Sequence, residues 1–173
     1  MKIEDVAHHL AAIPRFTGAS DQPYSVAQHS WLCSQLVVRR YALDALLHDA
    51  HEAYIGDVSR PMKALLGGAW DAVENSIATV VAARFGVAWP IPAEVAEVDD
   101  LVLATEWRDV MKRLENVSST TVEPLPVEFI KARWFRAWSP DLASFLFVSR
   151  FNELSGKRGT RDLAGAFYQP SKN

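Results

Sequence analysis

Apolar residues recur every three to four positions along most of this chain, which is the spacing of amphipathic α-helices. In one such stretch, Leu32, Cys33, Leu36 and Val37 fall on a single stripe. The same spacing predicts helices over residues 3–12, 26–40, 43–55, 70–85, 94–114, 128–138 and 140–154. No segment of useful length alternates between apolar and polar residues, as a half-buried strand would. We therefore predict an all-α fold in which residues 1–173 form one compact helical bundle.

Residues that favour helix ends and turns separate these ranges. Ser25 and Gln28 form the S-x-x-Q pattern of a capping box, and Pro140 suits the first position of the last helix. Gly56 stands where a left-handed residue is expected after a helix, and Gly86 is expected to stop the helix over residues 70–85. We expect loops or irregular connections at residues 14–23, 57–63, 89–92 and 116–126, and a loose polar tail from residue 155.

The composition is that of an ordinary globular protein and narrows the range of functions. Hydrophobic residues make up 49% of the chain and charged residues 23%, with a net charge of -3. A general duplex-DNA binder needs a basic face, so none is expected. The start of the chain does not resemble a signal peptide, and no apolar run approaches the roughly 18 residues of a membrane span. The single cysteine, Cys33, excludes an intramolecular disulfide, so we predict a cytoplasmic protein that does not contact membranes.

The segment ALLHDAHEAYIGD, at residues 45–57, carries ionisable groups inside an otherwise apolar helical pattern. His48 and Asp49 follow Ala45 and Leu46 at helical spacing, so both are expected to face the interior. Glu52 would lie about one turn further along the same face. Charged side chains are rarely buried unless they are paired or bind a metal. The cluster therefore indicates a divalent-metal site.

A metal site of this kind needs further ligands from other helices. His29 precedes Leu32 and Cys33 at helical spacing, so it is expected to face the interior as well. The 94–114 helix offers Asp99 or Asp100, between which helical geometry prefers Asp99 only slightly. Two imidazoles and several carboxylate oxygens suit one ion of Mn, Fe, Co, Ni or Zn rather than Ca.

Several of these residues also have a simpler structural interpretation. A lone inward histidine such as His29 is more often a hydrogen-bonded core residue than a ligand. Glu52 could orient His48 or Asp49 instead of taking part in chemistry. We expect His51 to lie on the surface, because it points to another side of the predicted helix.

The order H…HD…D resembles the signature of the HD-domain phosphohydrolases, an all-helical superfamily of metalloenzymes. YSVAQHS at residues 24–30 and LLHDAHEAYIGDVSRPMK at residues 46–63 resemble the 5′-deoxynucleotidase branch and the small phage enzymes that include dATP triphosphohydrolases. VDDLVLATE at residues 98–106 resembles the helix that supplies the last ligand, and the family pattern selects the first of its two aspartates. The resemblance covers about residues 15–106.

Carried over to this sequence, the resemblance implies four metal ligands: His29, His48, Asp49 and Asp99. It implies that Glu52 acts as an acid or base, that Asp57 is a carboxylate of the substrate pocket, and that Arg15 and Lys63 contact phosphate. As ordinary surface charges, the two basic residues would have no such role. Phe16 is a candidate for the apolar wall that a base or sugar needs.

These assignments imply a metal-dependent phosphohydrolase of deoxynucleotides in a bacterial or phage-infected cell. The connection between His29 and His48 is shorter than in the bacterial deoxynucleotidases. Together with the two basic loops, it favours a dNTP triphosphohydrolase that releases triphosphate, with dATP as the model substrate. The alternatives are a 5′-deoxynucleotidase acting on dNMPs, a non-catalytic nucleotide-binding module, and a di-iron oxygenase for which His51 is the obvious extra ligand. The resemblance also implies a homodimer or a higher homo-oligomer.

Overall fold

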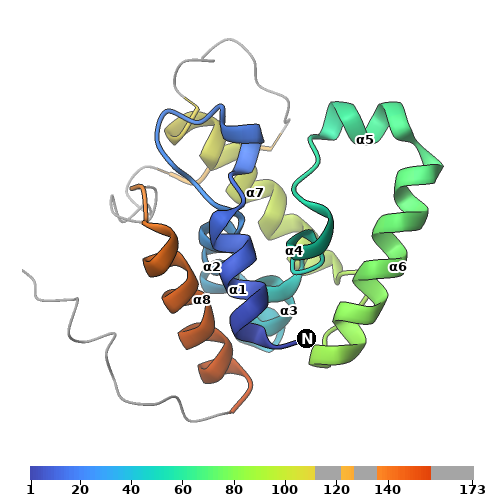
Figure 1. The fold of residues 1–173 in the computed structure, drawn as a ribbon. Coiled ribbons are helices and arrows are strands. Elements are labelled where there is room, and N and C mark those ends of the chain that lie inside the picture. The colour runs from blue at the N-terminus through green and yellow to red at the C-terminus, as the bar shows by residue number, and fades with distance from the viewer. Residues whose placement is uncertain (112–121, 127–135, 157–173) are drawn as a thin grey trace, which may run out of the picture.

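The computed structural model describes residues 1–111, 122–126 and 136–156, and this part of the chain contains helices and no β-strand (Figure 1). The predicted all-α fold class is confirmed. The α-helices are α1 (Ile3–Ala12), α2 (Val26–Leu36), α3 (Ala42–Leu47), α4 (Glu52–Ile55), α5 (Arg60–Leu66), α6 (Gly68–Phe85), α7 (Ala93–Asp109) and α8 (Pro140–Leu154), with 3₁₀ turns at Arg15–Gly18 and Arg39–Tyr41. Among the described helices, none is long and apolar enough to cross a membrane.

Helix α2 lies between two groups of buried apolar side chains and packs against α1, α3, α7 and α8. The first group joins α1, α3 and α8, where Leu10, Leu46 and Phe147 are fully buried. The second joins α2, α3 and α7 and includes Leu32 and Val102. Because α2 is covered on several sides, its polar residues are buried as well. Buried polar groups need hydrogen-bond partners, so this helix is suited to hold a buried polar site.

Several predicted helix ends are confirmed, and others are wrong. Helix α2 begins as predicted, with the Ser25 hydroxyl accepting the backbone N–H of Gln28 at 3.3 Å. It ends at Leu36 rather than at residue 40, because the backbone of Val37 becomes extended (φ -73°, ψ 156°). Helix α6 stops at Gly86 as predicted, and the φ of 72° and ψ of 33° of this glycine are left-handed.

The helix predicted over residues 43–55 is broken in two. Helix α3 ends at Leu47 and α4 begins at Glu52, whose backbone N–H donates to the carbonyl of Asp49 at 2.9 Å. A hydrogen bond over three residues marks a tighter turn than that of an α-helix. The break therefore falls at the predicted ligand pair, His48 and Asp49, and changes the direction in which the following side chains point.

Helices α5 and α6 form a lobe beside the rest of the fold (Figure 1). Helix α5 begins at Arg60, inside the loop predicted over residues 57–63, and all of its residues are at least partly exposed. Gly56 was expected to be left-handed; it has a positive φ of 80°, but its ψ of 164° is extended. The chain thus leaves α4 in an extended direction and reaches the lobe through a short connection.

Some predicted segments lie partly or wholly outside the described residues. They include most of the predicted 128–138 helix and the tail after residue 156. The helix predicted over residues 94–114 ends earlier than expected: α7 stops at Asp109, and the described residues Val110 and Met111 no longer belong to it. Of the connection predicted over residues 116–126, only residues 122–126 are described, and these form no regular element.

Candidate metal centre and adjoining pocket

Four predicted ligands converge from α2, the turn after α3, and α7. The Nε2 atom of His29 lies 3.4 Å from Nε2 of His48 and 3.0 Å from Oδ1 of Asp99. The Oδ2 atom of Asp49 lies 3.2 Å from Nε2 of His48 and 3.7 Å from Nε2 of His29. The structure therefore brings together every residue that the sequence predicts as a metal ligand.

Cys33 joins this cluster from the helical turn that follows His29. Its sulfur lies 3.6 Å from Nε2 of His29. The donor atoms of His29, Cys33, His48 and Asp99 all lie within 4.8 Å of one another, so this group could bind a metal ion. The sequence predicts Cys33 only as part of an apolar stripe. Because Cys33 follows His29 by four residues, the sequence already indicated that both side chains lie on one face of the helix.

Hydrogen bonds hold the second ring nitrogen of each histidine. Nδ1 of His29 lies 2.7 Å from Oε1 of Glu106, and Nδ1 of His48 lies 2.8 Å from the backbone carbonyl of Ala45. A carboxylate and a carbonyl accept hydrogen bonds, so each Nδ1 donates its proton. The Nε2 atoms, which carry the lone pair in the neutral ring, then face the other donors. Metal-binding histidines are usually oriented in this way.

Glu106 is a fully buried carboxylate whose role the sequence did not predict. Besides His29, it accepts hydrogen bonds from the hydroxyl of Tyr24 at 2.7 Å and from Nε and Nη2 of Arg15 at 3.2 and 3.0 Å. Burial acts to raise the pKa of Glu106, but the charges of Arg15 and His29 outweigh it and lower that pKa. Glu106 follows Asp99 by seven residues, which is two turns along the same face of α7. This spacing was the feature of the sequence that could have indicated a carboxylate near the cluster.

Carboxylates around the two histidines favour protonated rings when no cation is present. Burial acts to lower the pKa of His48, but Asp49 and Asp99 outweigh it and raise the pKa well above 6.5. The pKa of His29 is also raised. Burial acts to raise the pKa of Asp99, but hydrogen bonds from the two histidines lower it well below 3.8. The carboxylate oxygens of the cluster repel one another. Either bound protons or a metal ion would offset this repulsion.

Two residues next to the predicted ligands point away from the cluster. Asp100 forms an ion pair with Arg60 at 3.0 Å on the surface, so of the two adjacent aspartates Asp99 is the one in the cluster. His51 is only 4% exposed, and its Nε2 lies 3.4 Å from Oε1 of Glu74. The predicted surface position of His51 is therefore wrong, because the break before α4 turns this ring toward α6. Its contact with Glu74 also leaves it outside the cluster as an extra ligand.

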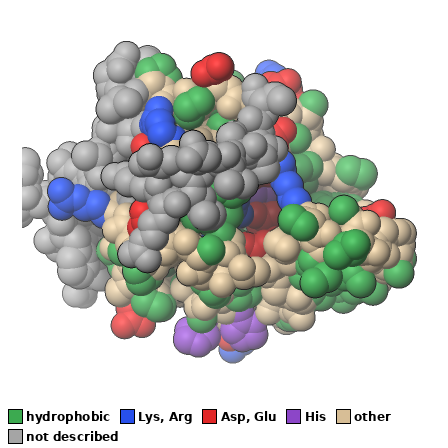
Figure 2. All heavy atoms as spheres, turned by 90° about the horizontal axis from the view of Figure 1, so that it is seen from above, with side chains coloured by type: hydrophobic (Ala, Val, Ile, Leu, Met, Phe, Trp, Pro, Cys, Tyr) green, Lys and Arg blue, Asp and Glu red, His purple; other side chains and the backbone are tan. Residues whose placement is uncertain are grey.

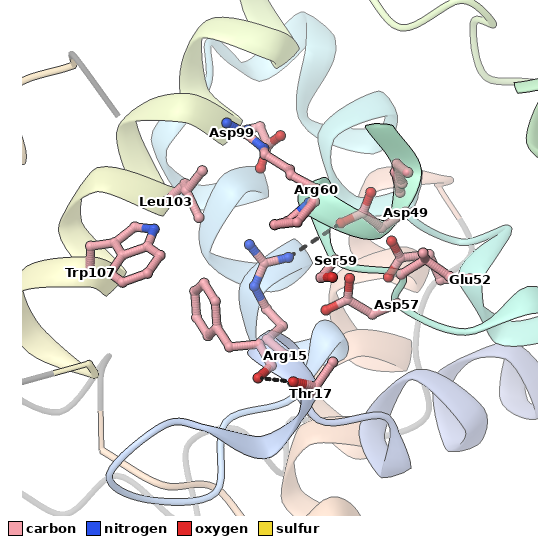
Figure 3. Close-up of a pocket in the computed structure, with 14 residues that line it drawn as sticks. Arg15, Thr17, Asp49, Glu52, Asp57, Ser59, Arg60, Asp99, Leu103 and Trp107 are labelled. Carbon is pink, nitrogen blue, oxygen red and sulfur yellow. Dashed lines mark hydrogen bonds and ion pairs between the residues drawn. The ribbon is translucent and has the colours of Figure 1, made fainter. Parts of the chain in front are cut away.

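A pocket of about 490 Å³ opens beside the cluster (Figure 3). Asp49 and Asp99 line it, so the donor cluster is accessible from the pocket. Leu103 and Trp107, four and eight residues after Asp99, line it from the same face of α7. Figure 2 shows acidic side chains in a hollow between the body of the protein and the lobe of α5 and α6.

Two further carboxylates that the sequence predicts as functional, Glu52 and Asp57, also line the pocket. Glu52 is 4% exposed, and its Oε2 has no hydrogen-bond partner among the described residues. Burial and the charges of Asp49 and Asp57 raise the pKa of Glu52 well above 4.5. Burial also raises the pKa of Asp57. Glu52 therefore retains a proton to a higher pH than an ordinary glutamate.

The two predicted basic residues line the pocket, and both are paired with carboxylates. Arg15 is buried, so it is not an ordinary surface charge, and its Nη1 lies 3.7 Å from Oδ2 of Asp49. Lys63 donates to Oε1 of Glu74 at 2.6 Å. These pairs hold positive charge at the pocket in defined positions.

Phe16, the candidate for an apolar wall, lines the pocket and packs edge-on against Trp107, with ring centroids 5.8 Å apart. Phe16 and Thr17 both have left-handed backbones, with φ of 55° and 52°. This conformation is unfavourable for large or β-branched side chains, and such residues often occur at functional sites. The strained turn places Phe16 beside the wall that α7 contributes.

Comparison with known proteins gives two relatives, and no family model matches the sequence. YfdR of Escherichia coli (strain K12), an uncharacterized protein, is 36% identical over 164 residues, which cover 90% of this chain and 85% of YfdR. The uncharacterized protein RCAP_rcc00048 of Rhodobacter capsulatus is 38% identical over 104 residues, covering 55% of this chain and 53% of that protein. With this level of identity over most of both chains, the protein belongs to the same family as YfdR.

Proposed function

We propose that this protein is a divalent-metal-dependent phosphohydrolase that acts on deoxynucleotides. The observation that carries the proposal is the convergence of His29, His48, Asp49 and Asp99 beside a pocket that also contains Glu52. Two imidazole nitrogens and carboxylate oxygens suit Zn, Co, Mn, Fe or Ni. These residues would hold a divalent ion, which would serve as a Lewis acid toward water and phosphoryl oxygens.

In this proposal, Glu52 moves the proton that hydrolysis of a phosphate ester requires. It lines the pocket next to Asp49, and one of its oxygens has no hydrogen-bond partner among the described residues. The raised pKa of Glu52 favours its protonated form, which can donate a proton to the leaving oxygen. In its ionised form, the same group can accept a proton from the attacking water.

The other side chains of the pocket suit the remaining parts of a nucleotide. Arg15 and Lys63 supply positive charge for phosphate oxygens, and their carboxylate partners hold them in place. Phe16 and Trp107 form an aromatic surface on which a base can stack. Asp57 can accept a hydrogen bond from a sugar hydroxyl.

Within this class we favour cleavage of a dNTP with release of triphosphate. Arg60 lines the pocket together with Arg15 and Lys63. Three cationic side chains suit a polyphosphate better than a single phosphate. The volume of about 490 Å³ lies within the range of small-molecule sites. Removal of the phosphate from a dNMP is the alternative reaction of the same machinery.

Product analysis tests this proposal directly. The purified full chain is incubated with a panel of dNMPs and dNTPs under Zn, Co, Mn and Mg. Tripolyphosphate released from dATP or another dNTP supports the triphosphohydrolase, whereas inorganic phosphate from a dNMP would make the protein a 5′-deoxynucleotidase. Binding of metal and nucleotide without any product would overturn the enzymatic assignment and favour a non-catalytic binding module.

The Glu52→Gln variant tests the proton-transfer role. It should keep the fold and the binding of metal and nucleotide, and lose turnover by about 10²- to 10⁴-fold. Glu97→Gln makes the same chemical change at an exposed position of α7 and serves as the matched control. Full activity of Glu52→Gln would contradict the role assigned to this residue.

A further inference from the structure

We infer that the thiolate of Cys33 is a direct ligand of the metal, so that the site binds zinc-like ions through one sulfur, two nitrogens and carboxylate oxygen. This inference rests on the proposed metal site and specifies its chemistry. Cys33 is fully buried on α2, one turn after His29. Its sulfur belongs to the group of donors that lie within 4.8 Å of one another.

The observed distances agree with those between ligands of a common ion. Around tetrahedral zinc, two nitrogens at about 2.1 Å lie roughly 3.4 Å apart, and a sulfur at about 2.3 Å lies roughly 3.6 Å from a nitrogen. Nε2 of His29 lies 3.4 Å from Nε2 of His48 and 3.6 Å from the sulfur of Cys33. Both separations from Nε2 of His29 therefore match those that a common ion would require, and the sulfur of Cys33 also lies within 4.8 Å of the donor atom of His48.

The orientation of the His29 ring accounts for its contact with the sulfur of Cys33. Nδ1 of His29 donates to Glu106, so Nε2 is the ring nitrogen that faces the sulfur, at 3.6 Å. On metal binding, the S–H bond of Cys33 and the Nε2–H bond of a protonated ring would break, the protons would pass to solvent, and a metal–sulfur bond would form without any change of oxidation state. The sulfur of Cys33 and Nε2 of His29 thus lie side by side as two adjacent ligand positions.

The position of Cys33 leaves the substrate side of the cluster open. Asp49 and Asp99 line the pocket, whereas Cys33 and the two histidines are not among the residues that line it in the described part of the chain. The sulfur would therefore bind without covering the face that a phosphate would approach. Thiolate is a soft ligand, so this set should favour zinc or cobalt over magnesium and manganese.

Cobalt substitution measures sulfur ligation without reference to activity. Apo protein is titrated with Co²⁺, and the near-ultraviolet thiolate-to-cobalt charge-transfer band is compared in the native chain, Cys33→Ser and Cys33→Ala. Because the chain contains one cysteine, the band has one possible source. Ser30→Ala, another small buried side chain of α2, is the matched control.

We expect the band in the native chain and in Ser30→Ala, and its loss in both Cys33 variants. Zinc affinity in these variants should fall at least about tenfold, since loss of even a supporting residue behind a ligand typically costs 10- to 100-fold. Zinc affinity should also fall more than manganese affinity. Cobalt bound by the native chain without the band would overturn sulfur ligation and leave the proposed function standing. Failure to bind any divalent ion would overturn both.

X-ray absorption of the zinc-loaded native chain gives a second measurement that needs no variant. Sulfur ligation predicts one sulfur atom at about 2.3 Å from zinc, beside nitrogen and oxygen atoms at about 2.0–2.1 Å. A first shell of only nitrogen and oxygen would refute the inference even if the Cys33 variants failed to fold.

Discussion

Replacement of Glu106 by glutamine tests how the candidate site is held together. Oε1 of Glu106 accepts from Tyr24 and His29, while Oε2 accepts two hydrogen bonds from Arg15. Glutamine has nearly the same shape but only one oxygen. Whichever way its amide is oriented, its NH₂ group faces either the two donors on one side or the guanidinium of Arg15. The substitution therefore removes the negative charge and places donors against donors.

The size of the effect follows from this geometry. A hydrogen bond to a charged group contributes about 1.5–3 kcal/mol, and removing one partner of a buried ion pair costs about 3–5 kcal/mol. We expect Glu106→Gln to lower the free energy of unfolding by about 3 kcal/mol. This value is at the lower end of the range for a buried ion pair, because glutamine keeps one acceptor oxygen. For a chain of this size, that change lowers Tm by roughly 6–12 °C. Loss of the carboxylate behind His29 should also weaken metal binding about 10- to 100-fold.

Two measurements check these values. Thermal unfolding followed by circular dichroism in the presence of a chelator reports the stability of the apo protein, and competition with a chromophoric chelator reports zinc affinity. Glu97→Gln is the control, because it makes the same change at an exposed position of the same helix. If Glu106→Gln matched the native chain in both Tm and zinc affinity, Glu106 would neither hold Arg15 nor orient His29, and the reasoning would be refuted.

Three further predictions concern the ligands, the pH dependence and the pocket. Asp99→Asn should abolish stoichiometric zinc binding, measured by elemental analysis. Asp100→Asn breaks only an exposed ion pair, so it should keep zinc and change the free energy of unfolding by less than about 1 kcal/mol. Equal zinc content in the two variants would contradict the ligand assignment. The raised pKa values of His29 and His48 stabilise the apo fold below pH 6.5, and this contribution is lost as the pH rises through their folded pKa values. Tm of the apo protein should therefore fall as the pH rises above 6.5, and added zinc should restore Tm because the ion replaces the bound protons. A Tm that does not change with pH would contradict this link between histidine protonation and stability. Trp107→Ala should raise KM for a deoxynucleotide by about 5- to 150-fold, the equivalent of 1–3 kcal/mol of stacking, with metal affinity unchanged; an unchanged KM would remove Trp107 from the binding surface.

The sequence by itself determined the helical class and most of the donor residues, because both depend on local spacing. Apolar periodicity marked α1, α2, α6, α7 and α8, and glycine or proline marked several of their ends. His29 and His48 could be recognised because polar groups stood on faces that the apolar pattern assigns to the interior. The choice between Asp99 and Asp100 needed the resemblance to a known family, since helical geometry alone separated them only slightly.

Only the tertiary structure decided which side chains from different helices touch. Glu106 and Cys33 occur at spacings that place them on the same faces as Asp99 and His29, but local spacing does not state what lies across the interface. The break before α4, and with it the burial of His51, likewise depends on contacts with other helices. The physical reason is that periodicity reports which face of a helix is buried, whereas distances between donor atoms are set by how helices pack against one another.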